Sequence, residues 1–248
     1  MRIGLRYVLS AAGIATLLLS GSVGTGVAAA PGPVAVASVS PAPGQVVGVA
    51  MPVTVTFAQP VADRAAAERS FSISSPNAPE GKFVWLKNDV VQWNPSTYWP
   101  AHSTISLSVG GAKTNFEAGA SVVGVADLDA HRFTVSIDGQ VAREMPASMG
   151  KPKHPTPVGS FTALEKQSPI IMDSRTIGIP LSDPEGYKLT VYYAVRATWG
   201  GVYVHSAPWS LASQGNSNVS HGCINLSPDN AAWYYNQVSI GDPIIVQA

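Results

Sequence analysis

The chain has 248 residues, and its 15 Lys and Arg residues balance 15 Asp and Glu residues. Charged residues make up only 12% of the chain, and its basic residues form no run longer than the spaced pair in KPKH (151–154). This composition excludes the clustered basic surface that nucleic-acid binding requires, and the abundance of Thr, Ser and Val favours a strand-rich protein.

The N-terminus predicts export. Arg2 and Arg6 precede an uncharged apolar stretch, and small residues then lead to AAA (28–30) and PGP. This order is typical of a secretory signal, here residues 1–30, with an Ala-x-Ala cleavage site. A retained membrane anchor is the alternative, because residues 8–30 carry no charge and roughly 20 residues span a bilayer. Either interpretation places the remaining chain outside the cytoplasm, with a membrane contact only through such an anchor.

Residues 31–121 are predicted to form an immunoglobulin-like β-sandwich. Short alternating segments recur there between turn formers: VTVTF (53–57), FSI (71–73), FVW (83–85), VQW (91–93) and ISLSV (105–109). Regularly spaced short strands of this kind are typical of an antiparallel sandwich. Trp85 and Trp93 are expected in its core, and residues 61–70 fit a short helix.

This first domain shows no catalytic spacing of His, Asp or Glu, so we interpret it as a spacer or packing module. Tyr98 and Trp99 leave a glycan-binding surface open as an alternative, although aromatic residues beside a turn more often pack in a core or at an edge.

Residues 122–248 are predicted to form a second, mostly β domain. Residues 131–145 read as a hairpin, since Asp138-Gly139 supplies the positive φ angles of a tight turn. Further strands are expected at 158–164, 188–198, 201–206 and 242–247. One helix is marked by Ser227 as N-cap and Pro228 at its first position, with Gly241 after its end.

The only cysteine of the chain, Cys223, lies in SHGCIN (220–225). Upstream, alternation in GVYVHS (201–206) places His205 on the strand face opposite Val202 and Val204. A loop rich in Ser, Asn and Gly separates the two segments, so the spacing permits His205 and Cys223 to converge. An unpaired thiol in an exported chain suggests a function, because an oxidising compartment makes it a liability.

Three interpretations of Cys223 compete. It fills space as a small buried hydrophobe, or it joins His205 and His221 as a metal ligand, although no further ligand spacing supports a metal. As a nucleophile it needs a nearby histidine to generate thiolate near neutral pH. Amide groups around Gly222 and Cys223, and the Asn225 side chain, would then be the donors for a developing oxyanion.

The segments HSAPWS (205–210) and SHGCINLS (220–227) together resemble the signature of the L,D-transpeptidases, which have a YkuD-like catalytic fold. PTPVGSF (155–161) is similar to that family's entry into a strand. With an exported N-terminus and an immunoglobulin-like domain in front, the order of parts resembles the mycobacterial L,D-transpeptidases from about residue 34 to residue 248.

The resemblance implies a role for each matching position. Cys223 would be the nucleophile and His205 its general base, oriented by the carbonyl of Ser206. His221 and Gly222 would shape the oxyanion region. Residues 169–192 would form a flap over the site, and the donor stem would meet four side chains: Met172, Tyr187, Trp209 and Asn225.

The resemblance also implies a reaction without a cofactor or metal. Cys223 would attack a peptidoglycan stem tetrapeptide, expel its terminal D-alanine, and pass the acyl group to an acceptor stem as a 3→3 cross-link. Carbapenem β-lactams would acylate the same thiol. A cysteine carboxypeptidase or endopeptidase with water as acceptor is the nearest alternative, and a non-catalytic wall-binding protein is the other. A sortase is disfavoured because no Arg lies a few positions after Cys223.

Overall fold

The computed structural model describes residues 35–248, so the predicted signal or anchor lies outside the described residues. Among residues 35–248, the structure contains no helix with the length and apolar character to cross a membrane. The chain is mainly β with one longer helix near its end, which confirms the predicted fold class.

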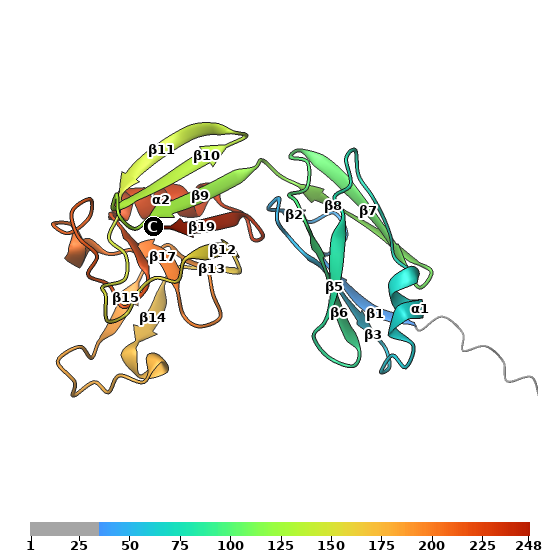
Figure 1. Cartoon of the computed structure of the whole chain (residues 1–248), viewed down its shortest axis with the longest axis horizontal. Coiled ribbons are helices and arrows are strands. Elements are labelled where there is room, and N and C mark those ends of the chain that lie inside the picture. Colours follow the sequence, from blue (N-terminus) through green and yellow to red (C-terminus); the bar gives the residue numbers. More distant parts are fainter. Residues whose placement is uncertain (1–34) are drawn as a thin grey trace, which may run out of the picture. The chain divides into compact units, whose positions relative to one another are not determined.

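The first domain consists of two sheets with strand orders β1-β3-β6-β5 and β2-β8-β7-β4 (Figure 1). The alternation of VTVTF explains β3, because its first, third and fifth side chains are buried and the two between them are partly exposed. The elements are β1 (Val36–Ser40), β2 (Val46–Val47), β3 (Val53–Phe57), α1 (Arg64–Arg69), β4 (Ser72–Ser74), β5 (Gly81–Trp85), β6 (Val90–Pro95), β7 (Ser103–Val109) and β8 (Ala112–Ala118).

Aromatic side chains fill the space between these two sheets. Trp93 and Trp99 lie in the core with ring centroids 5.3 Å apart. Trp85 is only partly buried and stacks on Phe57 at 6.1 Å, so the core prediction holds fully for Trp93 and in part for Trp85. Trp99 is 2% exposed and Tyr98 is 45% exposed. Trp99 is therefore a packing residue, which removes half of the aromatic pair considered for glycan binding.

The second domain is built on a five-stranded sheet of order β11-β10-β9-β19-β12. Its predicted hairpin is confirmed, with Asp138 at φ 50° and Gly139 at φ 82° in the turn. The late strand β19 pairs in parallel with β9 and antiparallel with β12 (Figure 1). The strands are β9 (Val122–Asp127), β10 (Arg132–Ile137), β11 (Gln140–Pro146), β12 (Gly159–Thr162) and β19 (Pro243–Gln247).

A second sheet of order β13-β16-β17-β18 carries His205 on β17, and β18 directly follows Cys223. A separate two-stranded hairpin, β14-β15, lies beside it. The elements are β13 (Glu165–Gln167), β14 (Ile170–Asp173), η1 (Ser174–Ile177), β15 (Lys188–Val191), β16 (Ala194–Arg196), β17 (Tyr203–Ser206), η2 (Pro208–Ser210) and β18 (Ile224–Leu226).

The helix α2 (Pro228–Gln237) begins where the sequence predicts. The Ser227 hydroxyl accepts a hydrogen bond from the amide of Asn230, which satisfies one of the free N–H groups of the first turn. Tyr234 on this helix is buried and meets the edge of Phe133 at a centroid distance of 4.9 Å. The helix thereby covers the five-stranded sheet from its inner face.

The predicted continuous strand at 188–198 is wrong, because the chain changes sheets in its middle. Tyr193 has φ 53°, in the left-handed region that extended strands do not use, and its amide donates to the Ser168 hydroxyl at 3.1 Å. Consequently β15 pairs with β14 and β16 pairs with β17. This break lets the β14-β15 hairpin leave the second sheet.

Candidate active site

The parallel pairing of β17 with β18 places the cysteine and the histidine on one face. His205 is aligned with Asn225, and Cys223 precedes Asn225 by two positions. Because side chains alternate along a strand, Cys223 and Asn225 point to the same side as His205. All three line one cavity of about 470 Å³.

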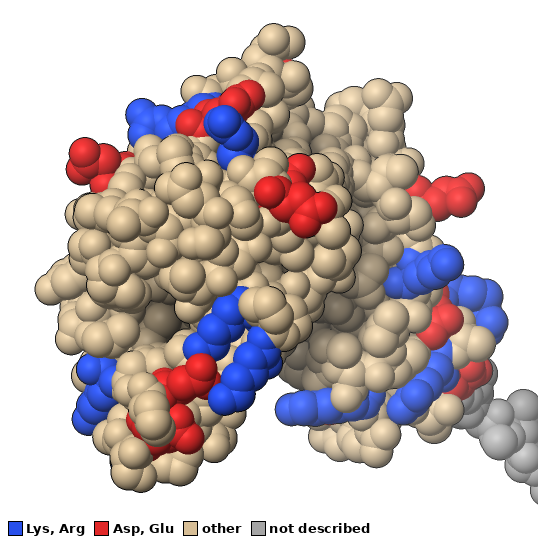
Figure 2. Space-filling view, turned by 60° about the vertical axis from the view of Figure 1, so that its left-hand side comes forward, with Lys and Arg blue, Asp and Glu red and all other residues tan. Residues whose placement is uncertain are grey.

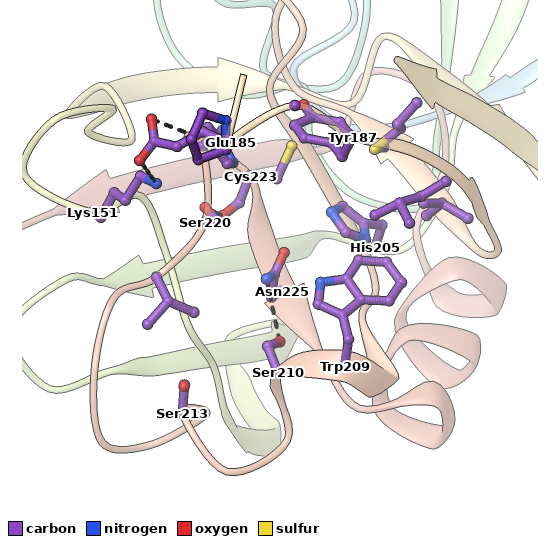
Figure 3. Close-up of a pocket in the computed structure, with 17 residues that line it drawn as sticks. Lys151, Glu185, Tyr187, His205, Trp209, Ser210, Ser213, Ser220, Cys223 and Asn225 are labelled. Carbon is purple, nitrogen blue, oxygen red and sulfur yellow. Dashed lines mark hydrogen bonds and ion pairs between the residues drawn. The ribbon is translucent and has the colours of Figure 1, made fainter. Parts of the chain in front are cut away.

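This cavity gathers side chains from several segments that are far apart in the sequence. Figure 3 shows Tyr187, Cys223, His205 and Trp209 around the same space, with Lys151 and Glu185 at one side. Met172 lines it too, whereas Ser206 and Gly222 lie behind the lining. The structure thus brings the predicted substrate-binding side chains together with the predicted nucleophile and base.

His205 is held in one orientation by the main chain. Its Nδ1 lies 2.8 Å from the carbonyl oxygen of Ser206, which only accepts, so Nδ1 carries the proton and Nε2 is the basic nitrogen. The side chain is 3% exposed, and burial lowers the pKa of His205 to about 4. His205 does leave the face of Val204, but both faces of β17 are covered, so it lies in a second buried layer.

Cys223 is half-buried and rests as a thiol. Its Sγ donates to the carbonyl oxygen of Gly201 at 3.6 Å, and the side chain packs beside Tyr203 and Val191. Burial raises the pKa of the Cys223 thiol to about 11. Burial thus favours the neutral forms of both Cys223 and His205 in the free protein near pH 7.

The amide of Gly222 is already engaged. It donates to the Ser220 hydroxyl at 3.0 Å, and the same hydroxyl donates to the carbonyl oxygen of Cys223 at 2.7 Å. In this conformation the Gly222 N–H is therefore not free for an oxyanion, and the role of Gly222 in the oxyanion region stays a prediction. The Cys223 amide has no hydrogen-bond acceptor within residues 35–248, so it is an available donor of this turn.

Asn225 supports the loop that follows β17. Its Nδ2 donates to the Ser210 hydroxyl at 3.2 Å (Figure 3). Gln214 Nε2 donates to the same hydroxyl at 3.2 Å. Trp209, one position earlier, lies with its ring centroid 6.0 Å from that of His205 and is 52% exposed. The Asn225 amide therefore holds the loop that places Trp209 over His205.

The predicted flap at 169–192 corresponds to the β14-β15 hairpin and its long connection. Ser174 closes this connection, because its hydroxyl donates to the carbonyl of Ile179 at 2.9 Å and accepts from the amide of Tyr187 at 3.0 Å. The Tyr187 ring lies 5.2 Å from the His221 ring, and burial raises the pKa of its hydroxyl. The flap thus presents Met172 and Tyr187 to the cavity.

Glu185, at the end of the flap connection, joins the flap to residues 151–154. Its carboxylate lies 2.5 Å from Lys151 Nζ, 2.9 Å from Lys153 Nζ and 3.2 Å from His154 Nε2. These hydrogen bonds hold the pKa of Glu185 at about 2. We call this group, made of Lys151, Lys153, His154 and Glu185, the flap latch.

His221 faces the flap latch, with Nε2 4.0 Å from the Glu185 carboxylate. The donor atoms of His154, Glu185 and His221 lie within 4.8 Å of one another. Two ammonium groups already neutralise this carboxylate, and repulsion from them disfavours a cation there. Neither His205 nor Cys223 belongs to this group, so the metal set considered from the sequence is not assembled.

Several residues at the site escaped the sequence analysis. Lys151 and Glu185 are 34 positions apart and gave no spacing signal, and Ser210 and Thr156 looked like ordinary turn residues. Ser220 stood inside the SHGCIN segment, where its hydroxyl lies within reach of the Gly222 amide two positions later. Only Ser220 carried a signal that local geometry would have revealed.

Comparison with known proteins follows the two domains. Residues 121–246 match a family model described as the L,D-transpeptidase catalytic domain, and residues 3–115 match a bacterial Ig domain model. L,D-transpeptidase 1 of Mycobacterium tuberculosis is 56% identical over 249 residues, which cover 99% of each chain. Probable L,D-transpeptidase 3 of the same organism is 56% identical over 234 residues, or 86% of each chain.

Solved structures agree with this similarity. An L,D-transpeptidase from Mycobacterium smegmatis gives a TM-score of 0.83 at 71% identity and covers 87% of this chain and 100% of that chain. The structure of LD transpeptidase LdtMt1 in complex with imipenem gives 0.81 at 60% identity, covering 86% and 99%.

Proposed function

The chain belongs to the L,D-transpeptidase family, and from this premise we propose that it forms 3→3 cross-links in peptidoglycan through a thioester on Cys223. The observation that supports this best is the common cavity of Cys223, His205 and Tyr187 under the flap. The enzyme is an acyltransferase of that family. Its proposed place of action is the cell wall, outside the plasma membrane, which agrees with the predicted export signal.

The first step is acylation. The Cys223 Sγ–H proton passes to Nε2 of His205 while the sulfur attacks the carbonyl carbon of the third stem residue. The tetrahedral intermediate collapses, the bond to the terminal D-alanine breaks, and the His205 imidazolium gives its proton to the departing amine. Because Nδ1–H is bonded to the Ser206 carbonyl, Nε2 keeps the lone pair that this step needs.

The neutral resting pair fits this sequence of events. A thiol with a raised pKa reacts only when a base removes its proton during the attack, so Cys223 stays protected until a carbonyl occupies the cavity. Charge then develops on the substrate oxygen, where an amide donor stabilises it in a site shielded from water.

The second step transfers the acyl group. An amine of a neighbouring stem peptide attacks the thioester, loses a proton to His205, and releases the sulfur, which takes that proton back. The flap, held by the flap latch, limits the entry of water that would otherwise hydrolyse the thioester. Carbapenems are proposed to acylate Cys223 by the first step alone, as the imipenem complex of a relative suggests.

Product analysis tests the proposal. Residues 31–248, intact or with Cys223→Ala, are incubated with purified disaccharide-tetrapeptide, and the muropeptides are identified by liquid chromatography with mass spectrometry. We expect dimers that lack one D-alanine, and none with Cys223→Ala. His205→Gln should lower their rate by at least a hundredfold, while His102→Gln serves as control because His102 is exposed and lies in the first domain.

Other products identify the alternatives. Monomeric tripeptide without dimers would show a cysteine carboxypeptidase on the same scaffold. No turnover by a folded chain would contradict an enzymatic role and favour a wall-binding protein.

A further inference from the structure

Thr156 connects two segments that meet behind the cavity. Its side chain is 2% exposed. The hydroxyl accepts a hydrogen bond from the Gly150 amide at 2.8 Å and donates to the Gly222 carbonyl oxygen at 2.9 Å. A single buried hydroxyl therefore ties the start of the 150–156 loop to the turn that carries Cys223.

The Gly222 carbonyl belongs to the same peptide unit as the Cys223 amide. In a trans peptide the C=O and N–H groups lie in one plane and point in opposite directions. Holding the carbonyl against Thr156 consequently aims the Cys223 N–H away from Thr156. Within the described part of the chain this N–H has no acceptor.

This peptide unit needs to be held. Gly222 has φ +116°, a backbone conformation that favours glycine. A Cβ atom at this position would lie 3.7 Å from its nearest neighbour, which is ordinary van der Waals contact. Since space does not require glycine there, the requirement is conformational. Ser220 fixes one side of the turn through the Cys223 carbonyl, and Thr156 fixes the other side through the Gly222 carbonyl.

We infer that Thr156 is a positioning residue, which aims the Cys223 amide at the oxygen of the tetrahedral intermediate. The inference rests on the proposed acylation of Cys223. Thr156 itself does not line the cavity, so it acts through the Gly222–Cys223 peptide. The inference predicts that loss of the Thr156 hydroxyl lowers the rates of reactions that pass through an oxyanion more than the rates of reactions that do not.

Two reagents for the same sulfur separate these effects. Imipenem acylates through a tetrahedral oxyanion, whereas iodoacetamide alkylates by direct displacement of iodide and develops no oxyanion. Both rates are measured by mass spectrometry of the intact protein. Each rate is normalised to the concentration of folded protein with a free Cys223 thiol. Thr156→Val should lower the acylation rate about tenfold to a hundredfold, within the loss expected for one oxyanion donor, and change alkylation less than twofold.

Matched variants complete the test. Thr156→Ser keeps the hydroxyl and should restore acylation to within about threefold of the parent. Thr114→Val removes a buried hydroxyl without a partner in the first domain and should change neither rate. If the valine variant does not fold, Thr156→Ala deletes the same hydroxyl without adding bulk, and the same ratio of the two rates is measured.

An equal loss of acylation and alkylation in the hydroxyl-deleted variant would mean a purely structural role and would overturn the inference. Acylation and alkylation rates that both stay at the parent values would overturn it as well. A parent chain that is alkylated but never acylated would contradict the proposed function, and the inference with it.

Discussion

Cys223 and His205 are each buried in a way that favours the neutral form. Burial removes water from a thiolate and from an imidazolium alike. It therefore raises the pKa of the Cys223 thiol to about 11 and lowers the pKa of the His205 imidazole to about 4. Across the range between these two values the pair holds its proton on sulfur. Activation therefore belongs to the complex with substrate.

The pH dependence of thiol labelling follows from these shifts. A raised pKa leaves less thiolate at any pH below it, so iodoacetamide should label folded Cys223 at pH 7.5 on the order of a hundredfold more slowly than the unfolded chain. The rate should keep rising through pH 10, because the folded pKa lies near 11. Measurement from pH 6 to pH 10.5 tests this, with the urea-unfolded chain as reference.

A labelling rate that levels off below pH 8 would contradict this expectation. It would show that thiolate and imidazolium form a pair before any substrate arrives.

At the residue scale, the sequence predicted which residues lie at the cavity better than it predicted the hydrogen bonds that they make. The SHGCIN and HSAPWS segments were sufficient to predict that Cys223 and His205 lie at one cavity, since the two segments belong to neighbouring strands. The Ser220 hydroxyl on the Gly222 amide and the Thr156 hydroxyl on the Gly222 carbonyl were not predictable, because they depend on a left-handed glycine and on a loop 66 positions away.

Among the elements, the β14-β15 hairpin forms a sheet of its own and packs on a small apolar cluster that includes Tyr203 and Cys223. Its strands pair only with each other, and exposed apolar side chains such as Ile171 and Leu189 lie along it. The flap latch adds polar contacts between the flap connection and residues 151–154 to this apolar packing. Charge at Glu185 is thus expected to control how often the flap opens.

Glu185→Gln should loosen the flap. The side chain is about a quarter exposed, so solvent screens its ion pairs and each contributes little, and hydrogen exchange of residues 180–191 should become roughly fivefold faster. Glu144→Gln is the matched control, since Glu144 makes a 3.6 Å ion pair with Arg132 on another hairpin. Exchange followed by mass spectrometry checks both.

The stabilisation that the flap latch supplies depends on pH in one direction. Glu185 has a lowered pKa in the folded chain, so its stabilisation is complete above about pH 4.3 and is lost as pH falls towards 2. Unchanged flap exchange in Glu185→Gln would contradict a latch. Faster exchange should be accompanied by more tripeptide and fewer dimers, because water then reaches the thioester.

Element prediction from the sequence succeeded where alternation was regular and failed at one junction. The strands of the first domain and the Asp138-Gly139 hairpin follow from period and turn chemistry. The break at Tyr193 did not, because a tyrosine with positive φ is rare and apolar residues continue on both sides of it. The end of the flap after β15 is therefore set by the backbone conformation of Tyr193, which the residue types in this segment do not predict.

At the scale of the whole molecule, charge on the face drawn in Figure 2 is distributed in small mixed groups. Figure 2 shows Lys and Arg beside Asp and Glu on this face, with wide uncharged areas between them. This agrees with a formal net charge of zero. Two-domain organisation was predictable from strand spacing, whereas the exact boundaries, predicted at 30/31 and 121/122, remain predictions.

Removal of residues 243–248 should abolish folding of the second domain. Strand β19 carries Ile244 and Val246, which are 0% and 2% exposed, and it pairs with strands on both sides, so its loss would split the five-stranded sheet. The first domain does not use this strand and should survive as a protease-resistant fragment identified by mass. Removal of the exposed Ala248 alone is the control, and acylation of the truncated chain by imipenem would contradict this expectation.

The central position of β19 also constrains the order in which the molecule can mature. A ribosome adds residues 243–247 after every other part of the site, and until they have emerged, β9 and β12 have no strand between them. A nascent chain therefore carries Cys223 before the five-stranded sheet of its domain is complete. We therefore expect the second domain to reach its folded form only after this strand has been synthesised.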